Sequence, residues 1–232
     1  MLHIIVPTCL ADQDVSREFV RTLVTTLHAE VAGCRMYFIV NEEDTFHRLP
    51  NPAGFRAYGI DLRLYAEARR IGFVNACNIG YRLADPADDD LVVVLNDDLV
   101  FEGDWLNPLA AAIHGGAAQA GPGLKWVGRD GFWGKGDEKY QYLEGWCFMT
   151  TGLTIRRAQA LPFGLRPTEL FDPAFAPAYC EDMDLSIRIQ ASGGILKQVD
   201  LPIRHLRNVT YERNHASWAR QRELLAEKWD LG

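Results

Sequence analysis

The stretch Leu91-Val-Val-Val-Leu-Asn-Asp-Asp-Leu-Val-Phe101 runs five apolar residues directly into one amide and two carboxylates. The apolar run follows the turn-forming segment Asp85 to Asp90 and predicts a strand that is buried on both faces. In open α/β sheets, ligands bind beyond the carboxyl ends of such strands. Asn96, Asp97 and Asp98 therefore stand where a binding site is expected.

The adjacent carboxylates of Asp97 and Asp98 repel each other by roughly 4 kcal/mol at about 4 Å and an effective dielectric of about 20. A bound divalent cation would offset this repulsion. Because side chains alternate along a strand, Asn96 and Asp98 share one face and Asp97 takes the other. We therefore expect Asp98 to contact a metal ion directly, with a solvated acidic turn as the alternative.

The composition fits a folded domain more than a membrane or nucleic-acid-binding protein. With 232 residues and 48% hydrophobic content, the chain can form one large domain with a sizeable core. No apolar run approaches the roughly 20 residues of a membrane span, and the first residues lack a basic leader, which favours a cytoplasmic protein. A net charge of −7 disfavours tight binding to nucleic acid or anionic membranes. The five scattered cysteines predict buried free thiols.

Alternating strand and helix patterns lie on both sides of the central stretch. Near the N-terminus, strand, helix and strand follow one another, which implies a right-handed crossover and a parallel sheet. The first strand is expected to stop at Pro7, and Asp14 or Ser16 to cap the first helix. We expect strands at residues 2–6, 37–40, 60–64, 144–154 and 195–199, and helices at 73–83, 105–113, 156–161, 185–189 and 216–229. Residues 125–142 are expected to form either a loop that covers a site or an ordinary hairpin with packed aromatic residues.

Three polar features outside the central stretch can be interpreted in more than one way. Asn78 interrupts an apolar helix and is either a surface residue or one that bonds a ligand or a neighbouring loop. Glu181, Asp182 and Asp184 begin a later helix, where the helix dipole alone favours acids by roughly 0.3–1 kcal/mol each. His205 stands in a locally basic stretch and is either a structural histidine or a ligand.

The order and spacing of these motifs resemble the glycosyltransferase family 2 group of GT-A enzymes over nearly the whole chain. The segments that carry the resemblance are Ile4–Thr8, Ile39–Asn41, Gly72–Gly80, Leu95–Asp98, Gly145–Arg157, Phe171–Phe175, Glu181–Arg188 and His205. Three positions depart from the family pattern. Asn41 replaces an aspartate near the nucleotide base, Arg70 replaces an asparagine, and Asn96 takes the first acidic place of the Asp-x-Asp motif.

The resemblance implies an α/β fold of the GT-A type, a Rossmann-like, mostly parallel central sheet flanked by helices, with a small acceptor-side mixed sheet. One domain would span residues 1–232, with a nucleotide-sugar half at 1–100 and an acceptor half at 101–232. Asp98 and His205 would bind Mn²⁺ or Mg²⁺. The donor would be contacted by Thr8, Asn41, Arg70, Asn78, Asn96 and Asp97, and Arg204, Arg207 or Arg213 would add bonds to its diphosphate.

The same resemblance places the catalytic base on Asp182, with Glu181 as the second choice. At the ordinary aspartate pKa of about 3.9, Asp182 would be ionised at pH 7 and need no tuning. The expected activity is metal-dependent, inverting transfer of a hexosyl or pentosyl group from a nucleotide-diphosphate donor to an acceptor hydroxyl. A saccharide, a lipid-linked sugar, a protein or a modified nucleic acid all remain open as acceptors, and so does the oligomeric state.

Two other functions compete with this expectation. A nucleotidyltransferase acting on sugar phosphates would typically need a basic glycine-rich loop after the first strand, and Pro7-Thr-Cys-Leu-Ala-Asp12 lacks one. A non-catalytic nucleotide-sugar-binding module would not need both Asp98 and Asp182. A Rossmann dehydrogenase is disfavoured because no Gly-x-Gly-x-x-Gly follows the first strand.

Overall fold

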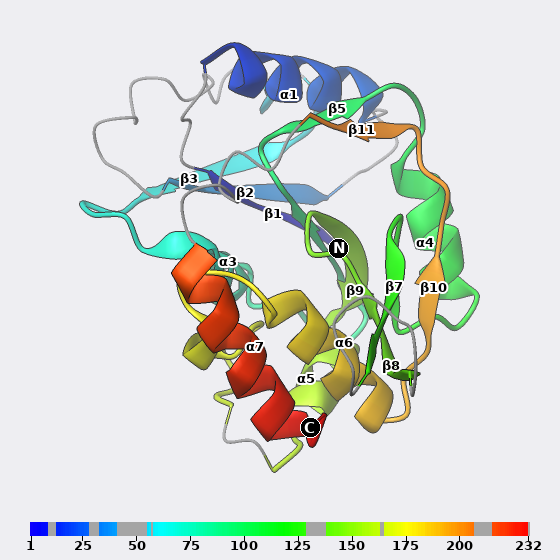
Figure 1. Ribbon diagram of the computed structural model, residues 1–232. Helices are drawn as coiled ribbons and strands as arrows, with labels where there is room; N and C mark the ends of the chain where they lie inside the picture. Colours follow the sequence, from blue (N-terminus) through cyan, green and yellow to red (C-terminus); the bar gives the residue numbers. More distant parts are fainter. Residues whose placement is uncertain are drawn as a thin grey trace.

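Figure 1 shows the computed structural model, which describes residues 1–8, 13–27, 33–40, 55–56, 58–128, 138–162, 165–206 and 215–231. Within these residues, a seven-stranded sheet has the order β10-β6-β9-β4-β1-β2-β3. Its strands are β1 (Leu2–Thr8), β2 (Cys34–Val40), β3 (Asp61–Ala66), β4 (Leu91–Leu95), β6 (Gln119–Gly121), β9 (Cys147–Thr151) and β10 (Leu196–Gln198).

Two small antiparallel sheets stand beside the large one. The strand that continues the central stretch, β5 (Leu99–Phe101), pairs with β11 (Ile203–His205), and β7 (Leu124–Gly128) pairs with β8 (Glu138–Leu143). The helices are α1 (Gln13–Thr26), α3 (Gly72–Ala84), α4 (Leu106–His114), α5 (Gly152–Gln159), α6 (Glu181–Ala191) and α7 (His215–Trp229), with a 3-10 turn, η2 (Pro173–Phe175).

The large sheet is parallel on one side and mixed on the other. Strands β4, β1, β2 and β3 are parallel neighbours, whereas β9 runs antiparallel to both β4 and β6. The mostly parallel α/β fold predicted from the sequence is therefore confirmed. The mixed region expected on the acceptor side is continuous with the central sheet through β9, and the β7–β8 pair forms a separate sheet.

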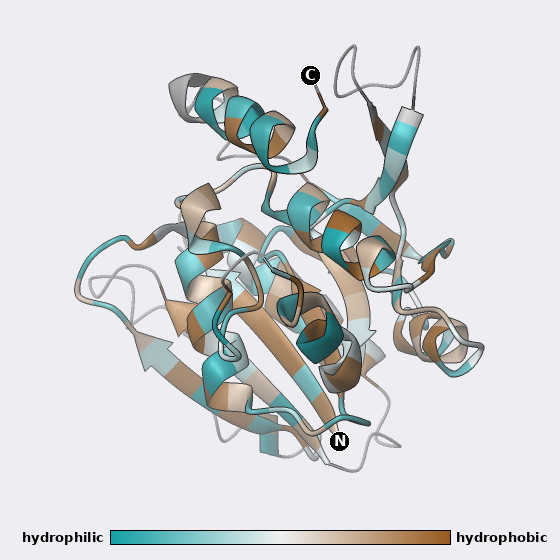
Figure 2. Ribbon diagram, turned by 90° about the horizontal axis from the view of Figure 1, so that it is seen from below, coloured by the Kyte–Doolittle hydropathy of each residue, from teal (hydrophilic) through white to brown (hydrophobic). Residues whose placement is uncertain are grey.

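Strand β4 lies in the middle and is buried on both faces, as its sequence predicts. Val92 and Val94 face a core that includes residues of α3, α5, α6 and α7. Val93 and Leu95 face the opposite core, formed with α1 and α4. Figure 2 shows these mostly hydrophobic central strands between helices of mixed polarity. The alternation follows from the two-residue period of a strand.

Close packing of α3 on the sheet explains two glycines of the Gly72–Gly80 segment. A Cβ at Gly80 would lie 2.5 Å from Cγ2 of Ile5 on β1, so the helix can approach the strand only with glycine there. Gly72 has a φ of +82°, and a Cβ there would lie 2.5 Å from Cβ of Pro177. Both positions therefore require glycine for reasons of space, and Gly72 also for its left-handed backbone.

The structure corrects several of the expected element boundaries. Strand β1 continues through Pro7 to Thr8; its pairing with β4 ends at Ile5, so beyond that residue no donor is needed on the β4 side. Helix α1 already begins at Gln13, so Asp14 and Ser16 lie inside it. For residues 125–142, the described ends favour the hairpin over the loop, because β7 and β8 pair antiparallel there. The expected strand 144–154 is shorter, because β9 begins only at Cys147 and α5 begins at Gly152.

Other sequence expectations can be compared directly with the described residues. Cys34, Cys77, Cys147 and Cys180 are buried free thiols, as expected, and Cys9 lies outside the described residues. None of the described helices combines the length and the apolar character that crossing a membrane requires.

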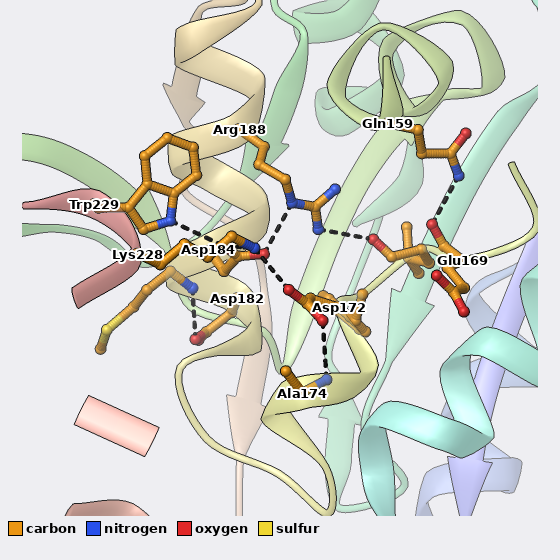
Figure 3. A network of polar contacts seen from close by, with 12 residues as sticks. Gln159, Glu169, Asp172, Ala174, Asp182, Asp184, Arg188, Lys228 and Trp229 are labelled. Carbon is orange, nitrogen blue, oxygen red and sulfur yellow. Dashed lines mark hydrogen bonds and ion pairs between the residues drawn. The ribbon is translucent and has the colours of Figure 1, made fainter. Parts of the chain in front are cut away.

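A buried ionic network joins α6 to α7 (Figure 3). The Asp184 carboxylate accepts hydrogen bonds from Nε of Arg188 and Nε1 of Trp229, both at 2.9 Å, and lies 2.8 Å from Nζ of Lys228. Lys228 also donates to Asp172 at 2.7 Å. The side chains of Asp184 and Arg188 have no exposed surface. The network therefore fixes the helix that begins with Glu181 and Asp182 against the C-terminal helix.

We predict that Asp184→Asn lowers the free energy of unfolding by about 3–5 kcal/mol, because it leaves the buried cations of Arg188 and Lys228 without their shared anion. Chemical denaturation monitored by circular dichroism measures the change. The matched control is Asp61→Asn, which removes an exposed partner of Arg63 and should cost less than about 1 kcal/mol. Equal effects of the two substitutions would contradict the role given to the network.

Candidate active site

The carboxyl end of β4 leads into a turn that brings Asp98 against His205. Nε2 of His205 lies 3.1 Å from each carboxylate oxygen of Asp98, but only Oδ2 makes the hydrogen bond. The buried Oδ1 of Asp98 has no hydrogen-bond partner. Two backbone features hold the pair: His205 is opposite Leu99 in the β5–β11 register, and the N–H of Leu206 donates to the carbonyl of Asp98 at 2.9 Å. The structure thus brings together Asp98 and His205, the two residues predicted as metal ligands.

The two residues before Asp98 have different environments. Asp97 accepts a hydrogen bond from the hydroxyl of Thr8, at the carboxyl end of β1. Asn96 has a buried Oδ1 without a hydrogen-bond partner, and its backbone N–H donates to the carbonyl of Trp146 at 2.9 Å. Thr8, Asn96 and Asp97, all predicted donor contacts, are therefore collected at one edge of the sheet.

This set of atoms fits a divalent cation held by few protein ligands. Asp98 and Asn96 each present a buried oxygen with no hydrogen-bond partner, and His205 presents a ring nitrogen. No group of three or more His, Cys, Asp or Glu residues forms a metal cluster among the described residues. Mg²⁺ and Mn²⁺ accept such sites because water and substrate phosphates complete their coordination, and Mn²⁺ tolerates a histidine.

A second acidic centre lies at the start of α6. The two carboxylate oxygens of Asp182 accept hydrogen bonds from the backbone N–H groups of Gly145, at 2.9 Å, and Met183, at 2.8 Å. Burial nevertheless raises the pKa of Asp182 to about 6, and the nearby charge of Glu144 acts in the same direction. The expectation of an ordinary aspartate pKa is therefore wrong.

Glu181 is more deeply buried than Asp182. Its Oε2 has no hydrogen-bond partner, and burial, followed by the charge of Asp182, raises its pKa well above the ordinary value. The backbone before it is unusual, because Tyr179 and Cys180 have φ values of 83° and 64°. Left-handed conformations are uncommon for residues other than glycine and occur often at functional sites.

The two centres are connected by the three residues Glu144–Trp146, which we call the connecting turn. At one end, the indole of Trp146 is stacked on the His205 ring, with centroids 5.1 Å apart and planes inclined by 24°. At the other end, Gly145 donates its N–H to Asp182. The connecting turn therefore contacts one residue of each centre, His205 through Trp146 and Asp182 through Gly145.

The remaining predicted site residues have other positions. Both polar groups of the Asn78 amide bond the backbone of Phe171, at 2.9 and 2.8 Å, so the structure favours the neighbouring-loop role over the ligand role. Arg70 is exposed. Arg204 is exposed and paired with Glu102, and it alternates with His205 along β11, so it is not directed at the same side. Residues 41, 207 and 213, the other predicted contacts, lie outside the described residues.

Glu144 and Trp146 belong to the site but are missing from the residues predicted for it. The carboxylate of Glu144 bonds Nζ of Lys125 and, at 3.2 Å, Nε1 of Trp146. The sequence interpretation placed both residues inside a strand. A charged residue, a glycine and a large aromatic directly before the small and apolar run that forms β9 were the available signal.

Comparison with solved structures shows GT-A glycosyltransferases with the same fold. A structure of GalNAc-T7 with UDP, GalNAc and Mn²⁺ has a TM-score of 0.72 at 14% identity and covers 99% of this chain. The mannosyltransferase PcManGT from Pyrobaculum calidifontis, with GDP-Man and Mn²⁺, has a TM-score of 0.56 at 15% identity over 86% of this chain. TarS of S. aureus has a TM-score of 0.58 at 12% identity over 87%.

These similarities concern the fold and extend over part of each neighbour. This chain matches 48%, 54% and 36% of the three neighbouring chains, in the order given. In sequence, it matches neither a protein-family model nor a curated protein.

Proposed function

We propose that this protein is a metal-dependent, inverting glycosyltransferase of the family 2 type that uses a nucleotide-diphosphate sugar. The observation that carries the proposal is the connecting turn, which contacts the Asp98–His205 pair at one end and the carboxylate of Asp182 at the other. In this proposal the first end is the site of the leaving diphosphate and the second end is the proton acceptor. The neighbours' titles, which name UDP or GDP-Man together with Mn²⁺, support this interpretation.

The donor half of the site would be formed by the edge residues at the ends of β1 and β4. Asp98 and His205 would hold Mn²⁺ or Mg²⁺, with Asn96 beside them. The cation would neutralise the charge that develops on the departing diphosphate. Thr8 would orient Asp97 through the hydrogen bond between them, which leaves Asp97 directed towards β1. The donor would thus bind to the half formed by residues 1–100, and the acceptor would bind to the half formed by residues 101–232.

Asp182 is better suited than Glu181 to remove the proton of the acceptor hydroxyl. Glu181 is buried, and burial raises its pKa well above the ordinary value, which disfavours the ionised form that a base requires. With a pKa of about 6, Asp182 is ionised in about nine molecules of ten at pH 7 and is close to the ideal for a general base. The hydroxyl oxygen then bonds the anomeric carbon as the diphosphate leaves from the opposite face. That single displacement inverts the anomeric centre.

Transfer of a nucleotidyl group to a sugar phosphate is the second candidate and predicts a different product. It would release pyrophosphate, whereas glycosyl transfer or slow donor hydrolysis releases a nucleoside diphosphate. Incubation of the protein with a panel of nucleotide sugars and Mn²⁺ tests the proposal directly. Release of a nucleoside diphosphate supports it, and NMR of the freed sugar gives the anomeric configuration. Retention in the first-formed product would overturn the inverting assignment, and no release from any donor would overturn the proposal.

We predict that Asp98→Asn weakens Mn²⁺-dependent binding of UDP or GDP by at least about tenfold, because even the outer partners of metal ligands contribute about 10–100-fold. Isothermal titration calorimetry measures this affinity. Glu102→Gln is the matched control, since Glu102 is an acid close by that pairs with the exposed Arg204. Unchanged affinity in Asp98→Asn would show that Asp98 is not a ligand.

We predict that Asp182→Asn slows sugar transfer or donor hydrolysis by about 10²–10⁴-fold, the usual contribution of a general base. Its affinity for UDP or GDP with Mn²⁺ should stay within about twofold, because Asp182 lies across the connecting turn from the cation site. Glu181→Gln is the comparison, and it should retain more activity because burial disfavours the ionised form of Glu181. Wild-type turnover in Asp182→Asn would refute the base assignment.

We predict that kcat/KM rises about tenfold from pH 5 to pH 7 and then levels off, because a carboxyl with a raised pKa of about 6 is a base only after it loses its proton. Initial rates of nucleoside diphosphate release across this range measure the profile. An ordinary aspartate with a pKa of about 3.9 would give an almost flat profile instead.

A further inference from the structure

The ring of Trp146 restricts the orientation of His205. Their near-parallel stacking places the indole over the imidazole, while Nε2 of His205 is directed at Asp98. The indole is itself held, because its Nε1 donates to Oε2 of Glu144 and the same carboxylate is paired with Lys125. The imidazole therefore has a fixed partner at its edge and a fixed aromatic surface on its face.

The backbone of Gly145 restricts Asp182 in a comparable way. Its N–H donates to Oδ2 of Asp182, and a Cβ at Gly145 would lie 3.0 Å from Cβ of Asp182. That distance is shorter than an ordinary contact, so any side chain at this position would displace Asp182. The glycine is buried, which leaves the aspartate little room to move away.

The connecting turn is also fixed to the donor edge through its backbone. The carbonyl of Trp146 accepts the N–H of Asn96 at 2.9 Å, and the N–H of Glu144 donates to the carbonyl of Gly123 at 2.9 Å. Strand β9 follows immediately and pairs with β4 from Cys147 to Thr151. The turn therefore cannot shift relative to β4 unless hydrogen bonds of the central sheet break.

From these contacts we propose that the connecting turn positions both halves of the reaction, with Trp146 orienting His205 and Gly145 orienting Asp182. Trp146 and Gly145 are positioning residues in this scheme, because each acts through another side chain. The inference rests on the proposed function and adds to it the segment that sets the distance between the cation site and the base. It also predicts that the two effects separate, one residue affecting donor binding and the other affecting turnover.

The experiment compares Trp146→Leu and Gly145→Ala with the wild-type full chain. Calorimetry measures the binding of UDP and of GDP, each with Mn²⁺, and nucleoside diphosphate release from the matching donors measures turnover. Trp146→Leu should weaken Mn²⁺-dependent nucleotide binding by about tenfold, the lower end for a partner of a metal ligand. Gly145→Ala should keep this affinity within about twofold but lower kcat by about 10–100-fold, since small misplacements of a catalytic group can cost that much.

Two control variants separate positioning from general loss of structure. Trp126→Leu removes an exposed tryptophan of the neighbouring strand β7, and Gly115→Ala adds a Cβ at the end of α4, 3.1 Å from the carbonyl oxygen of Ala111. Both should leave nucleotide affinity and kcat unchanged. Thermal denaturation of all four variants reports whether they fold, and a conservative Trp146→Phe, which keeps an aromatic ring, should recover most of the binding lost in Trp146→Leu.

The outcomes distinguish this inference from the function on which it rests. If the wild-type protein neither binds a nucleoside diphosphate with Mn²⁺ nor releases one from any donor of the panel, the proposed function and the inference both fail. If the wild type binds but Trp146→Leu binds equally well, or Gly145→Ala keeps wild-type kcat, only the positioning inference fails. If the two variants lose binding and turnover in the same proportion as they lose thermal stability, the turn has a structural role alone and the inference is again overturned.

Discussion

The constraint on which the structure depends is that β4 has no solvent-facing side. Val92 and Val94 are enclosed by one core and Val93 and Leu95 by the other, so no polar side chain fits along the strand. Polar residues can therefore follow only where the strand ends, and three of them occur together there. Asn96, Asp97 and Asp98 are thus collected at one sheet edge by burial of what precedes them. Thr8 reaches the same edge because β1 runs parallel to β4.

In the second half of the molecule, buried charged side chains hold the elements in place, whereas apolar burial does so in the first half. Helix α6 carries Asp184 and Arg188 at its centre without exposed surface, and α7 supplies Lys228 and the Trp229 indole (Figure 3). Buried ion pairs contribute little net stability, because desolvation offsets their attraction, but breaking one is costly. The main effect of such a network is therefore to specify one arrangement of α6, and its net contribution to stability is small. The acids at the start of that helix gain a defined position as a result.

The sequence predicts the parts of this structure that depend on local pattern. The apolar run of β4, the spacing of α3 and the acids at the start of α6 give the fold class and place Asp98 and Asp182 in separate elements. The predictions are less accurate where a contact between residues far apart in the sequence determines the role of a side chain. The side-chain amide of Asn78 forms both of its hydrogen bonds with the backbone of Phe171, 93 residues away. Likewise, the pKa of Asp182 is raised by burial that no local pattern shows.

Trp146 shows why some site residues escape sequence reasoning. By composition it belongs to a strand-like stretch, and its role depends on His205, which β11 brings to it from the far end of the chain. The contacts that build the site span 89 residues between Thr8 and Asp97, 107 between Asp98 and His205, and 37 between Gly145 and Asp182. Each of these three contacts joins segments that only the folded chain brings together. The three residues of the connecting turn are adjacent in sequence yet contact His205 at one end and Asp182 at the other, so they set the spacing between the proposed cation site and the proposed base.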